Sequence, residues 1–302
     1  MPVDQRMPGM RQDVPATRHA RKRLALLFTA VVLVVIAIVV LAVVRSGPRN
    51  GAEPAAAPEA PVAVAPDSLQ GSIQSVLDDN PDYRIGLAMA DVSGDAALAF
   101  GDQEAFTAAS TAKIITAAAY YHLVETGEAT LDDPLGDYDA AFQLEAMVNE
   151  SNNDSWLLLM DAVGYPQLTE YAASIGVDYD PEENLLTPAE MALVLKQLYA
   201  GDLLNQDNTA QLLSYMQDTN NEELIPAGSQ SGFEVFHKYG ELDGELHDAA
   251  VLAYRGSTFV LVIYTENADG TEGAGQADAI RELTAVVEKA LFPSVQAGNS
   301  TP

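Results

Sequence analysis

Cysteine is absent from this sequence of 302 residues, and basic residues are scarce, with 15 lysines and arginines against 44 aspartates and glutamates. A chain without cysteine forms no disulfide, carries no thiol nucleophile and has no cysteine for lipid attachment. A folded domain in this chain must therefore be stabilised mainly by its hydrophobic core.

The few basic residues are unevenly distributed. Eight of the fifteen lie in the first fifty residues, so the 252 residues that follow hold 7 basic and 42 acidic residues, a net charge of about −35. So acidic a region repels nucleic acid and anionic membrane surfaces. We therefore expect no nucleic-acid partner, and each lysine in that region needs an explanation.

One long hydrophobic run stands near the N-terminus. Residues 24–44 are 21 residues without a charge, about the length that crosses a bilayer core. The segment before the run holds more basic residues than the segment after it, namely Arg18, Arg21, Lys22 and Arg23 against Arg45 and Arg49. This bias predicts a single-pass protein of the cell membrane, with residues 1–23 in the cytoplasm, a transmembrane helix at 24–44 and the remainder outside the cytoplasm.

A cleaved signal peptide is the alternative interpretation of the same run. The run is long for a signal peptide, and the following AVVRSGPRN offers no small-x-small cleavage site. We therefore favour an uncleaved anchor.

The rest of the chain divides by composition. Residues 45–67 are rich in Pro, Ala and Gly without periodicity, which is typical of an extended linker. Residues 68–293 are long enough for one substantial domain and show no internal repeat. Residues 294–302 are expected to form a flexible tail.

Hydrophobic patterns predict the order of elements in the 68–293 domain. A helix (SLQGSIQSVLDDN) is followed by two short strands (YRIGLAMAD and AALAFG), and FTAASTAKIITAAAYY at 106–121 then begins a helical region. Its later helices are EAMVNESNNDSWLLLMDAVG, PQLTEYAASIG, TPAEMALVLKQLYAG and NTAQLLSYMQ. Three strands (GFEVFHK, LHDAAVLAYR and STFVLVIYTE) and a helix over about 276–291 complete the domain. This order predicts an α/β fold, with an antiparallel sheet formed by both chain ends, terminal helices covering it and an all-helical lobe inserted between.

A serine and a lysine occupy one face of the helix predicted at 106–121. Ser110 and Lys113 are three residues apart in an apolar stretch, so their side chains can meet. A serine hydroxyl becomes nucleophilic when a base accepts its proton, and burial can lower the pKa of a lysine enough for that role. Alone, this spacing is common by chance and equally describes a helix cap and a surface lysine.

Two further motifs make the pair more specific. Ser151-Asn152-Asn153 lies in the helical region, and Lys238-Tyr239-Gly240 ends the first returning strand. In this order and context, the three motifs resemble the S-x-x-K, S-D-N and K-T-G set of class A β-lactamases and penicillin-binding proteins. The domain over roughly 68–293 is accordingly identified as similar to class A β-lactamase-like serine hydrolases.

The resemblance implies a role for each motif. Ser110 would attack a strained or activated carbonyl, Lys113 would act as its base, and Ser151 would pass a proton to the leaving nitrogen. The substrate would be bound by Asn153, Tyr239, Gly240 and Glu241, while Lys238 would attract the substrate's carboxylate and lower the pKa of Lys113. The backbone N–H groups of Ser110 and Glu241 would form the oxyanion hole.

The sequence also departs from the family pattern. Asn152 stands for the usual Asp, a position that varies among penicillin-binding proteins, and Tyr239 stands for Thr or Ser, so a phenol ring would narrow the cleft or turn away. The deacylating E-x-x-x-N glutamate is missing, and the connection between Gly176 and Thr187 is short. Asp180 and Asn184 reproduce that spacing with Asp for Glu, although an acidic surface turn looks the same.

Three functions remain open on the sequence. The first is an acyl-enzyme-forming hydrolase, slow to deacylate, that acts on β-lactams or on D-Ala-D-Ala-type cell-wall peptides; the second is a β-lactamase with rapid turnover; the third is a catalytically silent binding or sensor domain. We expect no cofactor and no metal, because His122, His237 and His247 lack ligand spacing and are interpreted as structural. His247 and Asp248, on the strand beside Lys238-Tyr239-Gly240, could instead line the cleft. The sequence does not indicate an oligomeric state.

Overall fold

The computed structural model describes residues 66–94, 97–267, 269–271 and 273–292. The expected cytoplasmic tail, transmembrane helix, nearly all of the linker and the C-terminal tail lie outside these residues. In the described part of the chain, no helix combines the length and the apolar character that a membrane span needs.

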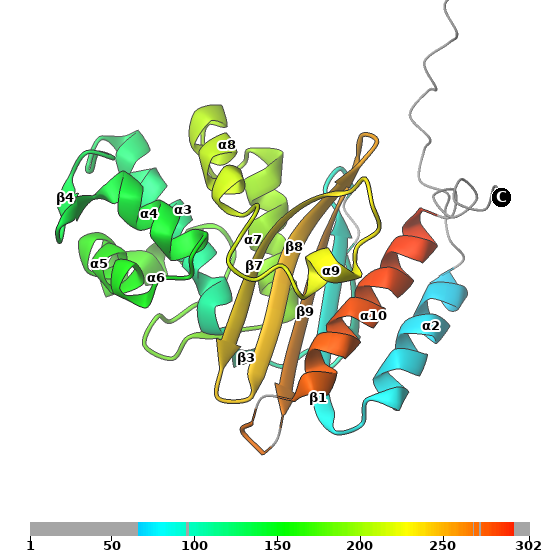
Figure 1. Ribbon diagram of the computed structural model, residues 1–302. Coiled ribbons are helices and arrows are strands. Elements are labelled where there is room, and N and C mark those ends of the chain that lie inside the picture. Colours follow the sequence, from blue (N-terminus) through cyan, green and yellow to red (C-terminus); the bar gives the residue numbers. More distant parts are fainter. Residues whose placement is uncertain (1–65, 95–96, 268, 272, 293–302) are drawn as a thin grey trace, which may run out of the picture. The chain divides into compact units, whose positions relative to one another are not determined.

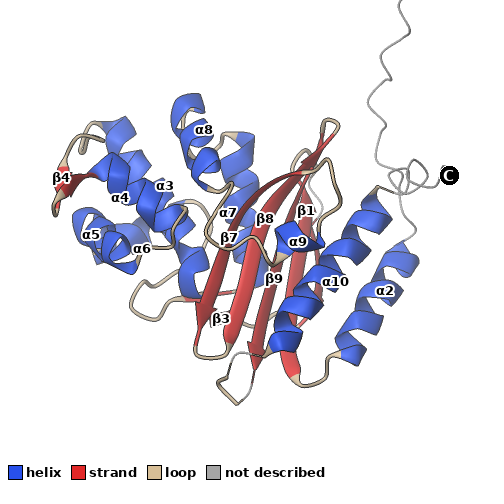
Figure 2. Ribbon diagram, viewed as in Figure 1, coloured by secondary structure: helices blue, strands red, loops and turns tan. Residues whose placement is uncertain are grey.

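A five-stranded antiparallel sheet forms the centre of the domain, with strand order β2-β1-β9-β8-β7 (Figures 1 and 2). Its strands come from both chain ends: β1 Tyr83–Asp91, β2 Ala97–Gly101, β7 Glu234–Leu242, β8 Glu245–Tyr254 and β9 Ser257–Asn267. The central β9 is apolar on both faces because both faces are covered. The predicted sheet is confirmed.

The two terminal helices, α2 (Pro66–Asp79) and α10 (Ala274–Leu291), lie side by side on one face of the sheet (Figure 1). Their apolar stripes bury residues such as Ile73 and Leu283 against Leu87 and Ile263 of the sheet. Each side chain of this size contributes about 1.5–3 kcal/mol when it is removed from water. The short α9 (Ile225–Gly228) packs on the same side and was not expected from the sequence.

The other face carries the inserted lobe, whose apolar residues form one large core with that face of the sheet. The lobe contains the 3₁₀ helix η1 (Ala109–Ala112), α3 (Lys113–Thr126), α4 (Ala140–Val148), α5 (Asn153–Val163), α6 (Tyr165–Ser174), α7 (Pro188–Ala200) and α8 (Gln206–Tyr215). It also contains two pairs of very short strands: β3 Phe106–Thr107 with β6 Leu185–Leu186, and β4 Pro134–Leu135 with β5 Tyr138–Asp139. The lobe is therefore almost, but not entirely, helical.

The helix ends follow the capping residues in the sequence. Thr187 and Glu190 form a capping box at the start of α7, and Gly201 ends that helix with a left-handed φ of 77°. Such a cap is worth about 1 kcal/mol. Both ends of α7 thus coincide with residue types that favour a helix start and a helix end.

Two helix predictions were wrong in detail, and both errors fall beside the polar motifs. The stretch 106–121 does not begin as a helix, because Phe106–Thr107 pairs with β6 and Ala109 has a φ of 48°. The helix predicted across Ser151 is broken into α4 and α5, because Ser151 has a φ of 56°. Left-handed backbone at non-glycine residues is strained and persists only where the surroundings enforce it.

Candidate active site

Ser110 is held at the turn that leads into α3. The backbone N–H of Ala108 donates to the carbonyl of Asn184 (2.8 Å), and the Asn184 side-chain amide donates to the carbonyl of Ala109 (3.3 Å). These bonds enforce the left-handed turn at Ala109. The N–H of Lys113 donates to the carbonyl of Ser110, which places the two residues on successive turns of one helical segment.

Lys113 is fully buried, and its ammonium group is surrounded by acceptors. Its Nζ donates to the Ser151 carbonyl (2.7 Å), to Ser151 Oγ (3.2 Å) and to Asn153 Oδ1 (2.8 Å). Burial lowers the pKa of Lys113 from 10.5 to about 7. A fraction of Lys113 is therefore neutral at physiological pH and able to accept a proton. In the described residues no hydrogen bond joins Lys113 Nζ to the Ser110 hydroxyl.

Ser151 owes its position to the break between α4 and α5. The N–H of Asn152 still bonds to the Ala146 carbonyl (3.0 Å), and the Asn152 side chain caps α5 by accepting from Ser155 N (2.9 Å). The left-handed φ of Ser151 turns its carbonyl toward Lys113. Asn152 is thus the helix cap that shapes this motif, which is consistent with an Asn in place of Asp.

Gly240 brings strand β7 against the nucleophile segment. A methyl group at Gly240 would lie 3.1 Å from the Ala108 carbonyl oxygen, from Ala109 Cβ and from Ser110 N. Glycine therefore permits an approach that any side chain would obstruct. The backbone of Ser110 therefore lies beside Gly240, the residue before Glu241. An oxyanion hole made of the Ser110 and Glu241 N–H groups stays a prediction.

Lys238 is the second buried lysine of the site. Its Nζ donates to the carbonyl of Tyr239 (3.0 Å) and lies 4.0 Å from the centre of the Tyr239 ring. Burial, followed by the charge of Lys113, lowers its pKa well below 10.5, and Asp248 opposes this shift. For Lys113 itself, burial rather than the charge of Lys238 is the cause of the lowered pKa. The Tyr239 ring packs over the ammonium of Lys238, so it does not turn away from the site. No described contact joins this ring to Ser110.

Asp180 is exposed and turned into its own loop. Its Oδ1 accepts the N–H of Glu182 (2.8 Å), and its backbone carbonyl accepts the N–H of Asn184 (2.8 Å). No described contact links the Asp180 carboxylate to Ser110. Asn184, in contrast, supports the nucleophile turn through Ala109. The loop therefore serves a structural purpose here, and a deacylating role for Asp180 stays a prediction.

The three histidines in the described part of the chain differ in their surroundings. His122 is exposed, whereas His247 and His237 are buried. His247 Nε2 donates to the Thr107 carbonyl (2.8 Å) and Nδ1 accepts the Thr265 N–H (3.1 Å), so this ring supports the strand before the nucleophile. Within residues 66–292, the described part holds no cluster of His, Asp and Glu suited to a metal ion.

The sequence analysis did not connect His237 with the site. This ring contacts Asp248, Glu222 and Thr219 directly behind Lys238. Asp248 is fully buried, and its carboxylate contacts His237 instead of lining an exposed cleft. The only sequence signal was the position of His237 next to Lys238, and nothing marked Glu222.

The fold and these groups are those of a serine hydrolase in which a buried lysine, Lys113, and not a histidine, follows the predicted nucleophile Ser110 by one turn. Residues 68–291 match the model of the beta-lactamase enzyme family, and the chain belongs to that family. It is a serine hydrolase of the class A β-lactamase-like type, as its motifs predicted.

Known proteins align with this chain over three quarters or more of their own length. Beta-lactamase CTX-M-8 of Citrobacter amalonaticus is 24% identical over 90% of this chain and 97% of its own, and a beta-lactamase of Amycolatopsis lactamdurans is 28% identical over 64% and 75%. Among solved structures, a point mutant of PBP-A in an acyl-enzyme complex with penicillin G superposes with a TM-score of 0.68 at 24% identity, covering 78% of this chain and 98% of that one. A beta-lactamase from Sphaerobacter thermophilus gives 0.65 at 22% identity, covering 76% and 98%.

Proposed function

We propose that this protein forms an acyl-enzyme at Ser110 with β-lactams or with D-Ala-D-Ala-type cell-wall peptides, and that this acyl-enzyme is released slowly. The observation that carries the proposal is the position of Lys113. Its amine is buried, has a pKa of about 7, and is anchored to Ser151 and Asn153 one turn from the nucleophile.

The chemical steps follow from these positions. Neutral Lys113 takes the proton of the Ser110 hydroxyl while the serine oxygen bonds to the carbonyl carbon. The developing oxyanion is stabilised by backbone N–H groups where Gly240 approaches Ser110. The C–N bond then breaks, and Ser151, hydrogen-bonded to Lys113, transfers the proton to the leaving nitrogen. The product is an ester on Ser110.

Mass spectrometry of the intact soluble domain after incubation with penicillin tests this step. We expect a mass increase equal to one penicillin on the unmodified protein and none on Ser110→Ala, with both proteins equally folded by circular dichroism. An adduct on Ser110→Ala would remove Ser110 from its role. A wild-type protein that takes up no penicillin would favour the silent binding or sensor domain.

Slow release is proposed because, within the described part of the chain, the carboxylate predicted to deacylate, that of Asp180, makes no contact with Ser110. Deacylation needs a carboxylate that holds and deprotonates a water beside the ester, and the Asp180 carboxylate is exposed and bonded within its own loop. A displacement of about 1 Å can cost roughly a hundredfold in rate.

The alternative is a β-lactamase with rapid turnover. It is favoured by one observation, the bond from Asn184 to Ala109, which keeps the Asp180 loop against the nucleophile turn. The Asp180→Asn variant separates the two, with Asp178→Asn on the same loop as its control. Slow release predicts that the penicillin adduct persists after free drug is removed and that Asp180→Asn scarcely changes its lifetime. Multiple turnover of nitrocefin that is lost in Asp180→Asn would establish the β-lactamase instead.

We also propose that the domain is anchored outside the cytoplasm by residues 24–44. The support is the uncharged run and its basic N-terminal flank. This location suits an enzyme that acts on cell-wall peptides.

A further inference from the structure

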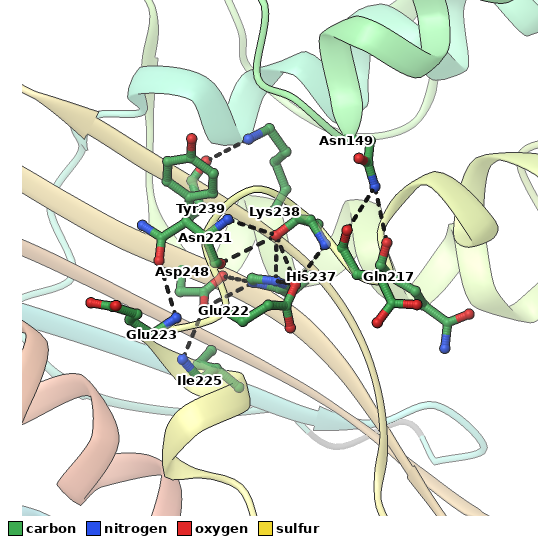
Figure 3. Close-up of polar contacts among 12 residues, drawn as sticks. Asn149, Gln217, Asn221, Glu222, Glu223, Ile225, His237, Lys238, Tyr239 and Asp248 are labelled. Carbon is green, nitrogen blue, oxygen red and sulfur yellow. Dashed lines mark hydrogen bonds and ion pairs between the residues drawn. The ribbon is translucent and has the colours of Figure 1, made fainter.

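His237 lies directly before Lys238 on β7 and is fully buried. Its Nδ1 lies 2.9 and 3.1 Å from the two carboxylate oxygens of Asp248, and its Nε2 lies 3.2 Å from Glu222 Oε1 and 3.0 Å from Thr219 Oγ1 (Figure 3). Both ring nitrogens therefore face a carboxylate.

This arrangement favours an imidazolium. A neutral imidazole has a single N–H, so one of the two carboxylates would face a lone pair. Burial alone would lower the pKa of His237, but the charge of Asp248 and the hydrogen bonds to Asp248 and Glu222 outweigh it and raise the pKa to about 9. The ionisable groups beside the ring are Asp248 of β8, Glu222 of the preceding loop and, next along β7, Lys238.

The histidine and Asp248 hold both ends of the loop 216–224, which connects α8 to α9. The backbone N–H of His237 donates to the carbonyl of Met216 (2.8 Å), and the Asp248 carboxylate oxygen Oδ2 accepts the backbone N–H of Ile225 (3.0 Å). One end of the loop is therefore tied to β7 and the other to β8.

The same loop is also hydrogen-bonded to the segment just before Ser151. The side-chain amide of Asn149 donates to the carbonyl of Gln217 (2.9 Å; Figure 3), and that of Asn220 donates to the carbonyl of Glu150 (2.8 Å). Glu150 immediately precedes Ser151. The loop is thus a strap from the residue before Ser151 to the residue before Lys238.

We propose that His237, as an imidazolium held between Asp248 and Glu222, is a positioning residue that clamps the 216–224 loop to the sheet and so sets the separation of Ser151 and Lys238. The inference rests on the proposed acylation of Ser110 for its functional consequence. The negative charge of Asp248 acts on both His237 and Lys238. Loss of the His237 proton therefore changes the electrostatic potential at Lys238 as well as the position of the loop.

The protonation state is tested first, by NMR titration of the histidine rings in the folded domain, residues 66–292. We expect the His237 ring to lose its proton only near pH 9, well above the ordinary histidine value of about 6.5. A His237 pKa at or below 6.5 would overturn the clamp.

The functional consequence is tested with Glu222→Gln, whose matched control is Glu223→Gln at the next position. Loss of one carboxylate should lower the His237 pKa by roughly 1–2 units, so the ring becomes neutral near pH 8 but stays charged near pH 6. We expect Glu222→Gln to slow penicillin acylation about tenfold at pH 8 and hardly at all at pH 6, with faster amide hydrogen exchange in 216–224 at pH 8. Glu223→Gln should match the unmodified protein at both pH values.

A merely structural effect of Glu222→Gln would slow acylation equally at both pH values, and this result, or no effect at all, would overturn the proposal. If the unmodified protein takes up no penicillin, the proposed function fails, while the titration and the hydrogen exchange still decide whether the clamp exists. If penicillin binds but His237 titrates normally, the clamp alone fails.

Discussion

Lys113 is the residue whose chemistry depends most directly on its burial. A lysine in water has a pKa near 10.4 and is almost fully charged at neutral pH, whereas burial brings the pKa of Lys113 to about 7. In the proposed mechanism only the neutral amine accepts the Ser110 proton, so we expect acylation to slow as the pH falls below about 7 and to speed up as it rises through that value.

The acylation rate should therefore rise with pH and level off above about pH 8. Stopped-flow measurement with a fluorescent penicillin gives this profile. In Asn153→Asp, a carboxylate replaces the amide oxygen 2.8 Å from Lys113 Nζ, which should raise the pKa of Lys113 and move the rising limb up by roughly 1–3 units. A flat profile, or one unmoved in Asn153→Asp, would show that Lys113 is not the base.

At the scale of elements, the site depends on how closely β7 approaches η1. An added methyl group at Gly240 meets backbone atoms and Ala109 Cβ at 3.1 Å, so the two elements must separate by a few tenths of an ångström. Overpacking of this kind costs about 1–3 kcal/mol, which a domain with so large a core can tolerate. The added methyl group should affect the acylation rate more than the stability, because the hydrogen bonds of an oxyanion hole require close geometry.

We expect Gly240→Ala to fold and to acylate roughly ten- to a hundredfold more slowly with penicillin. Gly71→Ala is the matched control, because a methyl group there has no atom within 4 Å and α2 lies on the other face of the sheet. The ratio of acylation rate constants, measured beside thermal unfolding, checks this. Equal rates in both variants would place the oxyanion hole elsewhere.

At the scale of the whole molecule, charge and hydropathy divide the chain into parts with different surroundings. The basic residues gather around the hydrophobic run at 24–44, and the acidic remainder carries about −35. An acidic domain is repelled by anionic lipid, so the proposed attachment to the membrane would depend on the hydrophobic run alone.

Protease added to spheroplasts should therefore digest the domain and spare a short N-terminal fragment, detected with a tag on residue 1. Replacement of Arg18, Arg21, Lys22 and Arg23 by Gln should weaken this orientation, because the basic flank determines it. A domain that resists protease until the membrane is lysed would contradict the outward location.

The sequence by itself determined the features that local chemistry encodes. Alternating and continuous apolar runs placed the five strands of the sheet, and the Thr187–Glu190 box with Gly201 marked both ends of α7. The motifs at Ser110, Ser151 and Lys238 were recognisable because residue type and order along the chain can be read without knowing any distance. These signals sufficed for the fold and the family.

Only the tertiary structure decided how those motifs act. The left-handed turns at Ala109 and Ser151 break helices that the local pattern favours, because contacts with Asn184 and Lys113 outweigh helix propensity. The pKa of Lys113 depends on burial, and the contact of His237 with Glu222 and Asp248 depends on how strands and loop pack. Distances and burial among residues far apart in the chain arise from the packing of the whole domain, which no local pattern records.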